Sequence, residues 1–208
     1  MSCVPDFVDL LWQLGVLVLS GGILYRTMQV DGELRECHQK RLWGVWFAAC
    51  IVAEAGFLVC MQGAEPVPKV CLLVLAVYFV VCSTMDSMLC MVNNFMQYIG
   101  AAGGGILVLH QLPRKEIGIS LLAFALVQYV LFRKMYGSAD VMAFLICALY
   151  LAGRNKNIED YLLHMTVCYL LLAVVQGARG NITEKGQLEK PVALYPYISA
   201  SFLLIIYQ

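Results

Sequence analysis

Long apolar runs, separated by short polar segments, dominate the pattern of hydrophobic and polar positions along the chain. A helix that crosses the hydrocarbon core of a bilayer needs about 20 mainly apolar residues, with about 17 as the practical minimum. Measured against this length, the pattern predicts eight transmembrane helices, at about 8–25, 42–62, 69–85, 94–111, 117–133, 140–152, 160–177 and 192–207. The segment 140–152 is short, and we expect its upstream end to be a loop at the membrane boundary.

The composition favours a membrane environment over an aqueous one. The chain has 208 residues, of which 61% are hydrophobic and 13% are charged, and its mean hydropathy is +0.76. Soluble domains have about 45–50% apolar and about 25% charged residues, and a small domain needs polar residues to cover its surface. We therefore expect an all-α polytopic membrane protein surrounded by the lipid bilayer. The formal net charge of zero gives no indication of a nucleic-acid partner.

The start of the chain lacks the pattern of a cleavable signal peptide. No basic residue precedes the first apolar run, and Asp6 and Asp9 lie at its beginning. A signal peptide carries positive charge at that place. The sequence thus predicts that the first run is retained as a transmembrane helix.

The distribution of lysine and arginine predicts the orientation of the chain in the cytoplasmic membrane. With eight spans, alternate loops lie on the same side, and basic residues favour the cytoplasmic side. One side holds the nine basic residues Arg26, Arg35, Lys40, Arg41, Arg133, Lys134, Arg179, Lys185 and Lys190. The other side holds the five basic residues Lys69, Arg114, Lys115, Arg154 and Lys156. The first side is therefore predicted to be cytoplasmic, with both termini outside.

Two aspartates fall at the same face of the membrane in this topology. Asp86 lies at the cytoplasmic end of the span 69–85, and Asp140 lies at the cytoplasmic start of the span 140–152. Ionisable residues at membrane depth usually face a cavity or a partner. The two carboxylates are therefore candidates for one shared site. Each also fits a helix-capping role, since a carboxylate at a helix N-terminus interacts favourably with the helix dipole.

The other polar and small residues within the apolar runs have ordinary explanations. Glu54 fits a protonated or hydrogen-bonded packing residue, and His110 and His164 fit positions between helices. Gly100 and Gly104 form a GxxxG pair, which is typical of close helix packing. The nine cysteines include no CxxC pair, so we expect small apolar residues and neither a metal site nor a cofactor.

Three short motifs occur in order along the chain. Residues 86–94 read Asp-Ser-Met-Leu-Cys-Met-Val-Asn-Asn, residues 137–140 read Gly-Ser-Ala-Asp, and residues 191–197 read Pro-Val-Ala-Leu-Tyr-Pro-Tyr. On these motifs the chain resembles the type IV prepilin peptidases, GxGD-type intramembrane aspartyl proteases. This family includes the tight-adherence pilin peptidases of bacteria and the preflagellin peptidases of archaea. The resemblance implies that residues 69–208 form a six-helix peptidase core and that residues 1–62 form two accessory transmembrane helices.

The resemblance also implies roles for individual residues. It makes Asp86 and Asp140 the catalytic pair. Asn94 matches the last residue of the Ile-Pro-Asn-like turn that follows the first aspartate in the family, although Asn93 replaces the proline and the loop lacks basic residues. The run Gly137, Ser138 and Ala139 matches the residues before the second aspartate, with Ala139 in place of a glycine, as in the archaeal branch. Family members commonly carry lysine where this chain has Met142.

The activity that the resemblance implies is removal of the leader peptide from type IV or Flp-like prepilins at the cytoplasmic membrane face. Two close carboxylates share one proton, so one activates water while the other hydrogen-bonds the scissile carbonyl, and no metal is needed. The expected partners are the prepilin helix and the pilus assembly machinery. The small face around Gly100 and Gly104 is a hypothetical entry for the extended substrate segment. N-methylation is not expected, because the loop after the first helix holds only Cys37 where such members carry CxxC pairs.

Two other functions remain open at the level of sequence. The chain fits a catalytically degenerate pilus-assembly membrane protein, because Asn93 and Met142 depart from the family pattern. It also fits a small proton-coupled transporter that uses Asp86 and Asp140, although no inverted repeat or pair of broken helices is evident. Nearby pilin and secretion-ATPase genes favour either pilus-related function, whereas transport predicts uptake that depends on a proton gradient.

Overall fold

The chain folds into α-helices in every regular element that the structure describes. The computed structural model describes residues 7–30, 39–61, 65–111, 114–132, 137–181, 188 and 192–206. The elements are α1 (Phe7–Val30), α3 (Gln39–Met61), α4 (Pro66–Leu89), α5 (Asn94–Gln111), α6 (Lys115–Val130), α7 (Ser138–Gly153), α8 (Ile158–Ala178) and α9 (Tyr195–Ile206). The expected all-α class is confirmed for these residues, and each predicted span corresponds to one helix.

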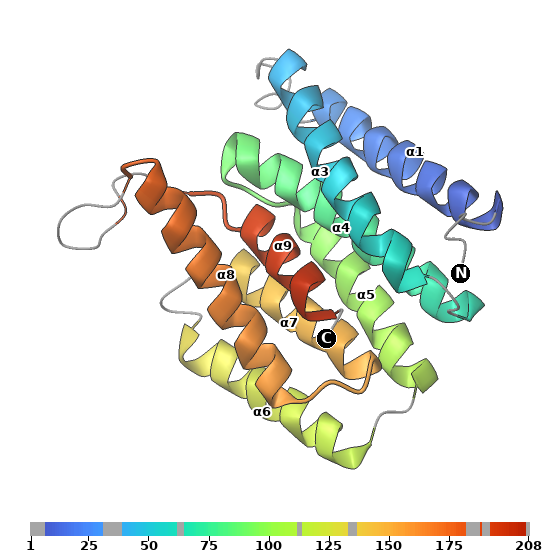
Figure 1. Cartoon of the computed structure of the whole chain (residues 1–208), viewed down its shortest axis with the longest axis vertical. Coiled ribbons are helices and arrows are strands. Elements are labelled where there is room, and N and C mark those ends of the chain that lie inside the picture. Colours follow the sequence, from blue (N-terminus) through green and yellow to red (C-terminus); the bar gives the residue numbers. More distant parts are fainter. Residues whose placement is uncertain are drawn as a thin grey trace.

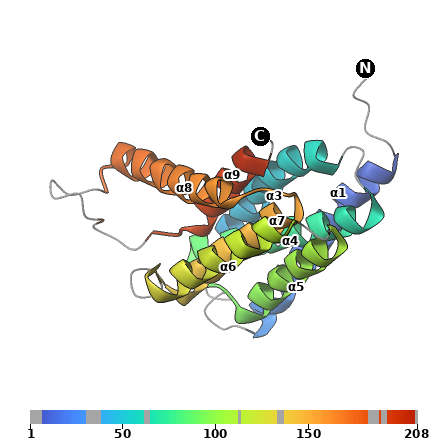
Figure 2. The same ribbon diagram turned by 90° about the horizontal axis from the view of Figure 1, so that it is seen from below.

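The helices form a bundle in which α4 and α7 are the central elements. Helix α4 contacts α1, α3, α5 and α9, and α7 contacts α5, α6, α8 and α9. The helices α1 and α3 lie along one edge of the bundle and α6 lies along the opposite edge, as Figure 1 shows. The view from below shows α8, α9 and α3 on one side of the bundle and α6 and α5 on the other (Figure 2). The arrangement surrounds α4 on several sides, which explains its long series of buried residues.

Helix α4 extends further than the sequence predicts. The expected span ends at residue 85, whereas the helix continues to Leu89, and the loop that follows comprises residues 90–93. Cys90 ends the helix in the left-handed conformation, with φ of 51°, and its N–H donates to the Asp86 carbonyl at 2.8 Å. Because the helical hydrogen bonds continue for one more turn, Asp86 lies within the last turn of α4 and not after it.

The two helices that carry the other motifs also differ from the expected bounds. Helix α7 begins at Ser138, two residues earlier than expected, after the extended Gly137. Helix α9 begins at Tyr195, three residues later than expected, and it has 12 residues. Pro196 explains the later start. Proline suits the first turn of a helix, because the N–H groups of that turn make no intrahelical hydrogen bonds and the N–H that proline lacks is not needed there. The N-terminus of α9 therefore begins inside the bundle, next to α4.

The glycines of α5 serve close helix packing. A Cβ at Gly100 would lie 3.0 Å from Cδ2 of Tyr78 in α4, and a Cβ at Gly104 would lie 2.8 Å from Cβ of Leu149 in α7. Large side chains of the two central helices thus occupy the space beside the small face of α5. The packing interpretation of the GxxxG pair is confirmed, and the hypothesis that this face admits a substrate segment stays a prediction.

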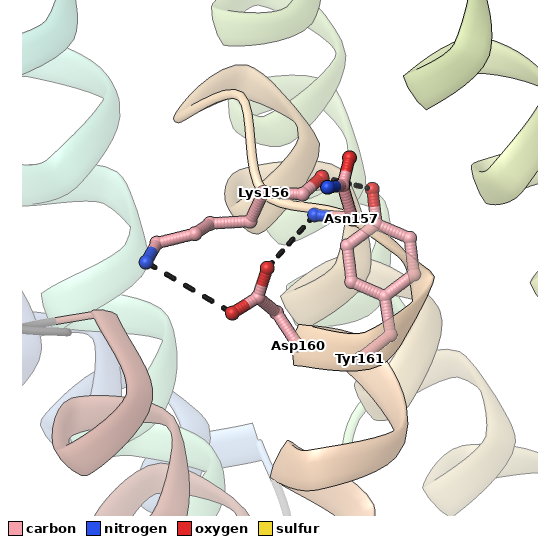
Figure 3. A network of polar contacts seen from close by, with 4 residues as sticks. All are labelled: Lys156, Asn157, Asp160 and Tyr161. Carbon is pink, nitrogen blue, oxygen red and sulfur yellow. Dashed lines mark hydrogen bonds and ion pairs between the residues drawn. The ribbon is translucent and has the colours of Figure 1, made fainter.

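Helix α8 has a well-formed polar N-terminus. The Asp160 carboxylate accepts a hydrogen bond from the Asn157 N–H at 2.8 Å and lies 3.9 Å from Lys156 Nζ. The Tyr161 hydroxyl donates to the Lys156 carbonyl at 3.0 Å, and Figure 3 shows these contacts together. A side chain that binds a free N–H at a helix start stabilises that end of the helix, so the N-terminal position of α8 is well defined.

Two described helices, α4 and α8, are long and apolar enough to cross a membrane, and α7 and α9 are shorter apolar helices. Helix α4 is mostly buried inside the bundle, whereas most of α8 is not. These lengths and compositions support a membrane character in part, and the eight-span topology stays a prediction.

Candidate active site

The carboxylate of Asp86 is buried between the end of α4 and the beginning of α9. Only 7% of the residue is exposed. Its Oδ2 accepts a hydrogen bond from the Tyr195 backbone N–H at 2.9 Å, and the Leu194 N–H is a second backbone donor to the carboxylate. The first N–H groups of a helix have no intrahelical acceptor, and they favour a negative charge at this end. Asp86 therefore holds the N-terminus of α9 against α4.

Asp140 lies in the first turn of α7 and has fewer partners. The residue is half-buried. Its carboxylate accepts a hydrogen bond from the backbone N–H of Gly137, the residue that precedes α7. It interacts electrostatically with Asp86, and also with Cys168 in α8 and Tyr195 in α9. The structure thus brings together the two aspartates that the sequence predicts to share a face, although 54 positions separate them along the chain.

Tyr195 connects the two aspartates through both ends of the residue. Its backbone N–H binds Asp86 at 2.9 Å. Its hydroxyl donates to the carbonyl of Ala139, the residue before Asp140, at 3.3 Å. The residue is fully buried. One rigid side chain therefore fixes the start of α7 relative to the end of α4.

A buried network of hydroxyl and amide groups surrounds the Tyr195 hydroxyl. Gln97 Nε2 donates to this hydroxyl and, at 3.3 Å, to the Ala139 carbonyl. Tyr78 Oη lies 3.2 Å from Gln97 Oε1 and 3.2 Å from the Tyr195 hydroxyl. Both Tyr78 and Gln97 are buried. Buried polar groups are costly unless they are satisfied, so this network joins four helices, α4, α5, α7 and α9, at the position of the two aspartates.

The supporting residues predicted from the motifs have unequal places in this geometry. Ala139 takes part through its carbonyl, and Gly137 precedes α7 in an extended conformation. Ser138 and Asn94 are exposed, and no hydrogen bond is seen for their side chains within the described residues. At the start of α5, the Asn93 side chain accepts from the Phe95 N–H at 2.8 Å, so Asn93 rather than Asn94 caps that helix.

Sequence reasoning missed the three residues of the buried network. Tyr78, Gln97 and Tyr195 lie on three helices, and only Tyr195 falls within a motif. The available signal was Gln97 itself, a glutamine inside an apolar run and the fourth residue of α5, because a buried amide needs hydrogen-bond partners. Tyr195 also had a signal, since it precedes Pro196 in the third motif.

The remaining polar candidates lie apart from this site. His164 is 1% exposed, its Nε2 lies 3.1 Å from the Ile198 carbonyl, and its ring packs between Phe144 and Phe202. Glu54 in α3 is half-buried, and its Oε1 has no hydrogen-bond partner. Neither residue is seen to contact the aspartates in the described chain; the position of His164 between two rings agrees with its assignment to packing.

The cysteines whose side chains the structure describes are free thiols. Five are buried between helices: Cys50, Cys71, Cys82, Cys147 and Cys168. Cys90 is exposed at the end of α4. Within the described ranges, no group of three or more histidine, cysteine, aspartate or glutamate side chains is placed to hold a metal ion.

Comparison with protein-family models, with curated proteins and with solved structures gives no match for this chain.

Proposed function

We propose that the chain is a membrane-embedded aspartyl endopeptidase that removes the leader peptide of type IV or Flp-like prepilins at the cytoplasmic membrane face. The observation that carries the proposal is the link made by Tyr195, which binds Asp86 through its backbone and the residue before Asp140 through its hydroxyl. A pair of carboxylates held near each other is the minimum equipment for aspartyl proteolysis. The motif resemblance supports the same pair.

A multi-pass membrane location fits the outer surface of the bundle. Helix α6 exposes Ile119, Leu122 and Leu126 by 63–70%, and α8 exposes Leu170 and Val174 by 62% each. Monomeric soluble proteins rarely expose such continuous apolar faces, whereas lipid-facing helices require them. We expect the chain to stay in the membrane pellet after an alkaline wash, and its release into the supernatant would contradict this location.

The hydrogen bonds of the two aspartates favour different roles. Asp86 accepts backbone N–H groups from Leu194 and Tyr195, and such donors stabilise an ionised carboxylate. We assign Asp86 as the base that takes a proton from water as the water oxygen attacks the scissile carbonyl. Asp140 holds the shared proton and donates it to the carbonyl oxygen, which stabilises the tetrahedral intermediate. As the intermediate collapses, the C–N bond breaks, Asp86 gives the proton it took from water to the leaving amine, and Asp140 takes back the proton from the carbonyl oxygen.

The environment of Asp86 also fits a second function, that of a protein without catalytic activity. The carboxylate serves α9 as a capping group, and this structural task needs no catalysis. A catalytically degenerate pilus-assembly protein, which binds the prepilin helix without cleavage, would keep this cap. The two functions differ in one measurable outcome, which is leader removal.

The deciding experiment is cleavage of a candidate prepilin co-expressed with the chain. Wild type, Asp86→Asn and Asp140→Asn are compared by gel shift and N-terminal sequencing, with Asp160→Asn as a matched control at the start of α8. We expect wild type and D160N to remove the leader and D86N and D140N to leave it intact while remaining in the membrane. Cleavage by either site variant would refute the paired mechanism, and an intact authentic prepilin with wild type would favour the degenerate protein.

A further inference from the structure

Two adjoining cavities lie between α3, α4 and α9, beside the site but separate from it. The first has a volume of about 310 Å³ and the second about 400 Å³. They share Val45, Ser87 and Pro196 in their walls, so the two cavities lie side by side. Neither wall includes Asp86 or Asp140, and any ligand there would leave the aspartates uncovered.

The first cavity is apolar and has small residues on the side of α3. Ala49 and Ala53 of α3 face Phe79 of α4 and Leu203 of α9 across it. Its polar groups are hydroxyls from serines of α4 and α9, including Ser83. A volume near 300 Å³ is at the lower end of the range found for small-molecule sites, whose walls are mainly apolar. The space therefore fits hydrocarbon and offers no charge to a polar ligand.

The second cavity is polar and carries positive charge. Arg41 at the start of α3 and Arg179 at the end of α8 both contribute to its wall. Both side chains are exposed, and no described carboxylate pairs with either of them. Among the described residues these two guanidinium groups face the cavity without a carboxylate partner, and guanidinium groups match the geometry of a phosphate.

The wall between the two arginines is held in place by hydrogen bonds. Gln176 Nε2 donates to the Tyr197 hydroxyl at 2.8 Å, and Asn181 Nδ2 donates to Gln176 Oε1 at 2.8 Å. Because the Tyr197 oxygen accepts here, its own proton is available to an acceptor in the cavity. Donors that are already fixed in place reduce the entropy lost on binding. The Tyr197 hydroxyl is therefore a third donor to an anion, beside the two arginines.

We propose that this space binds one anionic phospholipid, with an acyl chain in the apolar cavity and the phosphate at Arg41 and Arg179. An elongated ligand with a hydrocarbon part and an anionic head matches both halves, and basic pockets between transmembrane helices on the cytoplasmic side bind such head groups. Both arginines belong to the side predicted to be cytoplasmic. The proposal depends on membrane residence and not on proteolysis.

The test is lipid binding to the purified full chain in detergent, measured by native mass spectrometry. The probes are palmitoyl-oleoyl phosphatidylglycerol and palmitoyl-oleoyl phosphatidylcholine, which have the same acyl chains. We expect phosphatidylglycerol to bind at least about tenfold more tightly than phosphatidylcholine, the order of effect expected for charge-assisted hydrogen bonds. Equal affinity for the two lipids would overturn the proposal, and so would competition by glycerol 3-phosphate alone, since the acyl chain would then contribute nothing.

Paired variants locate the lipid. R41Q/R179Q is expected to lose the preference for phosphatidylglycerol, whereas R114Q/K115Q removes the same charge from exposed positions at α6 and is expected to keep it. Retained preference in R41Q/R179Q would overturn the assignment of the head group.

The position of the acyl chain is tested in two ways. Ala49→Trp fills the apolar cavity and is expected to lower the affinity for both lipids at least about fivefold. The control is Ala123→Trp on the exposed face of α6, which is expected to leave both affinities unchanged. Because A49W also disturbs packing, a phosphatidylglycerol with a photoactivatable acyl chain is crosslinked to wild type. Labelled peptides from α3, α4 or α9, which line the apolar cavity, support the proposal, and labelling confined to other helices overturns it.

Discussion

Removal of the Tyr195 hydroxyl is the most informative single change in the bundle. Tyr195→Phe keeps the ring and the backbone N–H that binds Asp86. It deletes the oxygen that contacts Tyr78, Gln97 and the Ala139 carbonyl. The change therefore separates the anchoring of Asp86 from the anchoring of the start of α7.

The expected loss of stability follows from what the partners keep. Without the hydroxyl, Tyr78 Oη still lies 3.2 Å from Gln97 Oε1, and Gln97 Nε2 still lies 3.3 Å from the Ala139 carbonyl. No buried group loses its last partner, so the cost is that of ordinary hydrogen bonds, about 0.5–1.5 kcal/mol each. For two to three such bonds we expect a loss of about 1–4.5 kcal/mol in the free energy of unfolding. A chain of this size loses about 2–4 °C in Tm per kcal/mol, so the expected shift in Tm is about 2–18 °C.

Thermal unfolding in detergent, followed by circular dichroism, measures this shift. Tyr98→Phe is the control, because Tyr98 is 70% exposed and no hydrogen bond is seen for it in the described chain, and its Tm is expected to stay within about 1 °C of wild type. Tyr78→Phe is expected to cost at least as much as Y195F, since Gln97 Oε1 then lacks its protein donor. A Tm of Y195F equal to that of Y98F would refute the reasoning that the hydroxyl holds α7 in place.

Three further predictions concern packing, orientation and capping. Gly104→Ala is expected to cost about 1–3 kcal/mol of unfolding free energy because its Cβ meets Leu149, whereas Gly105→Ala meets open space and is expected to cost nothing, as chemical denaturation would show. The exposed Cys90 thiol is expected to react with an impermeant maleimide in inverted vesicles but not in right-side-out vesicles, with the labelled cysteine identified by peptide mapping. Labelling of Cys90 only in right-side-out vesicles would refute the predicted orientation. Asp160→Ala is expected to cost about 1 kcal/mol through the lost cap of α8, and an unchanged Tm would contradict that role.

The sequence predicts the helices well because each apolar run is long enough to be one element. It also predicts that Asp86 and Asp140 share one end of the bundle, because alternate helices reverse direction and place both carboxylates on the same face. Helix ends are less predictable. The end of α4 passes residue 85 because nothing in Ser-Met-Leu after Asp86 breaks a helix, and only the left-handed Cys90 stops it.

The site could be predicted only in part, because its support depends on contacts between distant helices. Gln97 and Tyr78 are separated by 19 positions and Tyr78 and Tyr195 by 117, and no local pattern specifies such pairs. The glycine face of α5 shows the same limit. Small residues indicate close packing, but only the tertiary arrangement tells that Tyr78 and Leu149 lie beside them.

The substitution of asparagine for aspartate separates the structural and catalytic explanations of Asp86. Its amide oxygen can accept the same N–H groups of Leu194 and Tyr195. A residue that only caps α9 should therefore tolerate Asp86→Asn, with the free energy of unfolding lowered by no more than about 1–2 kcal/mol through loss of charge. A catalytic base does not tolerate it, because an amide cannot take a proton from water. We therefore expect D86N to keep most of its thermal stability and to lose leader cleavage. Unfolding of D86N at a much lower temperature would instead show that the charge itself maintains the bundle.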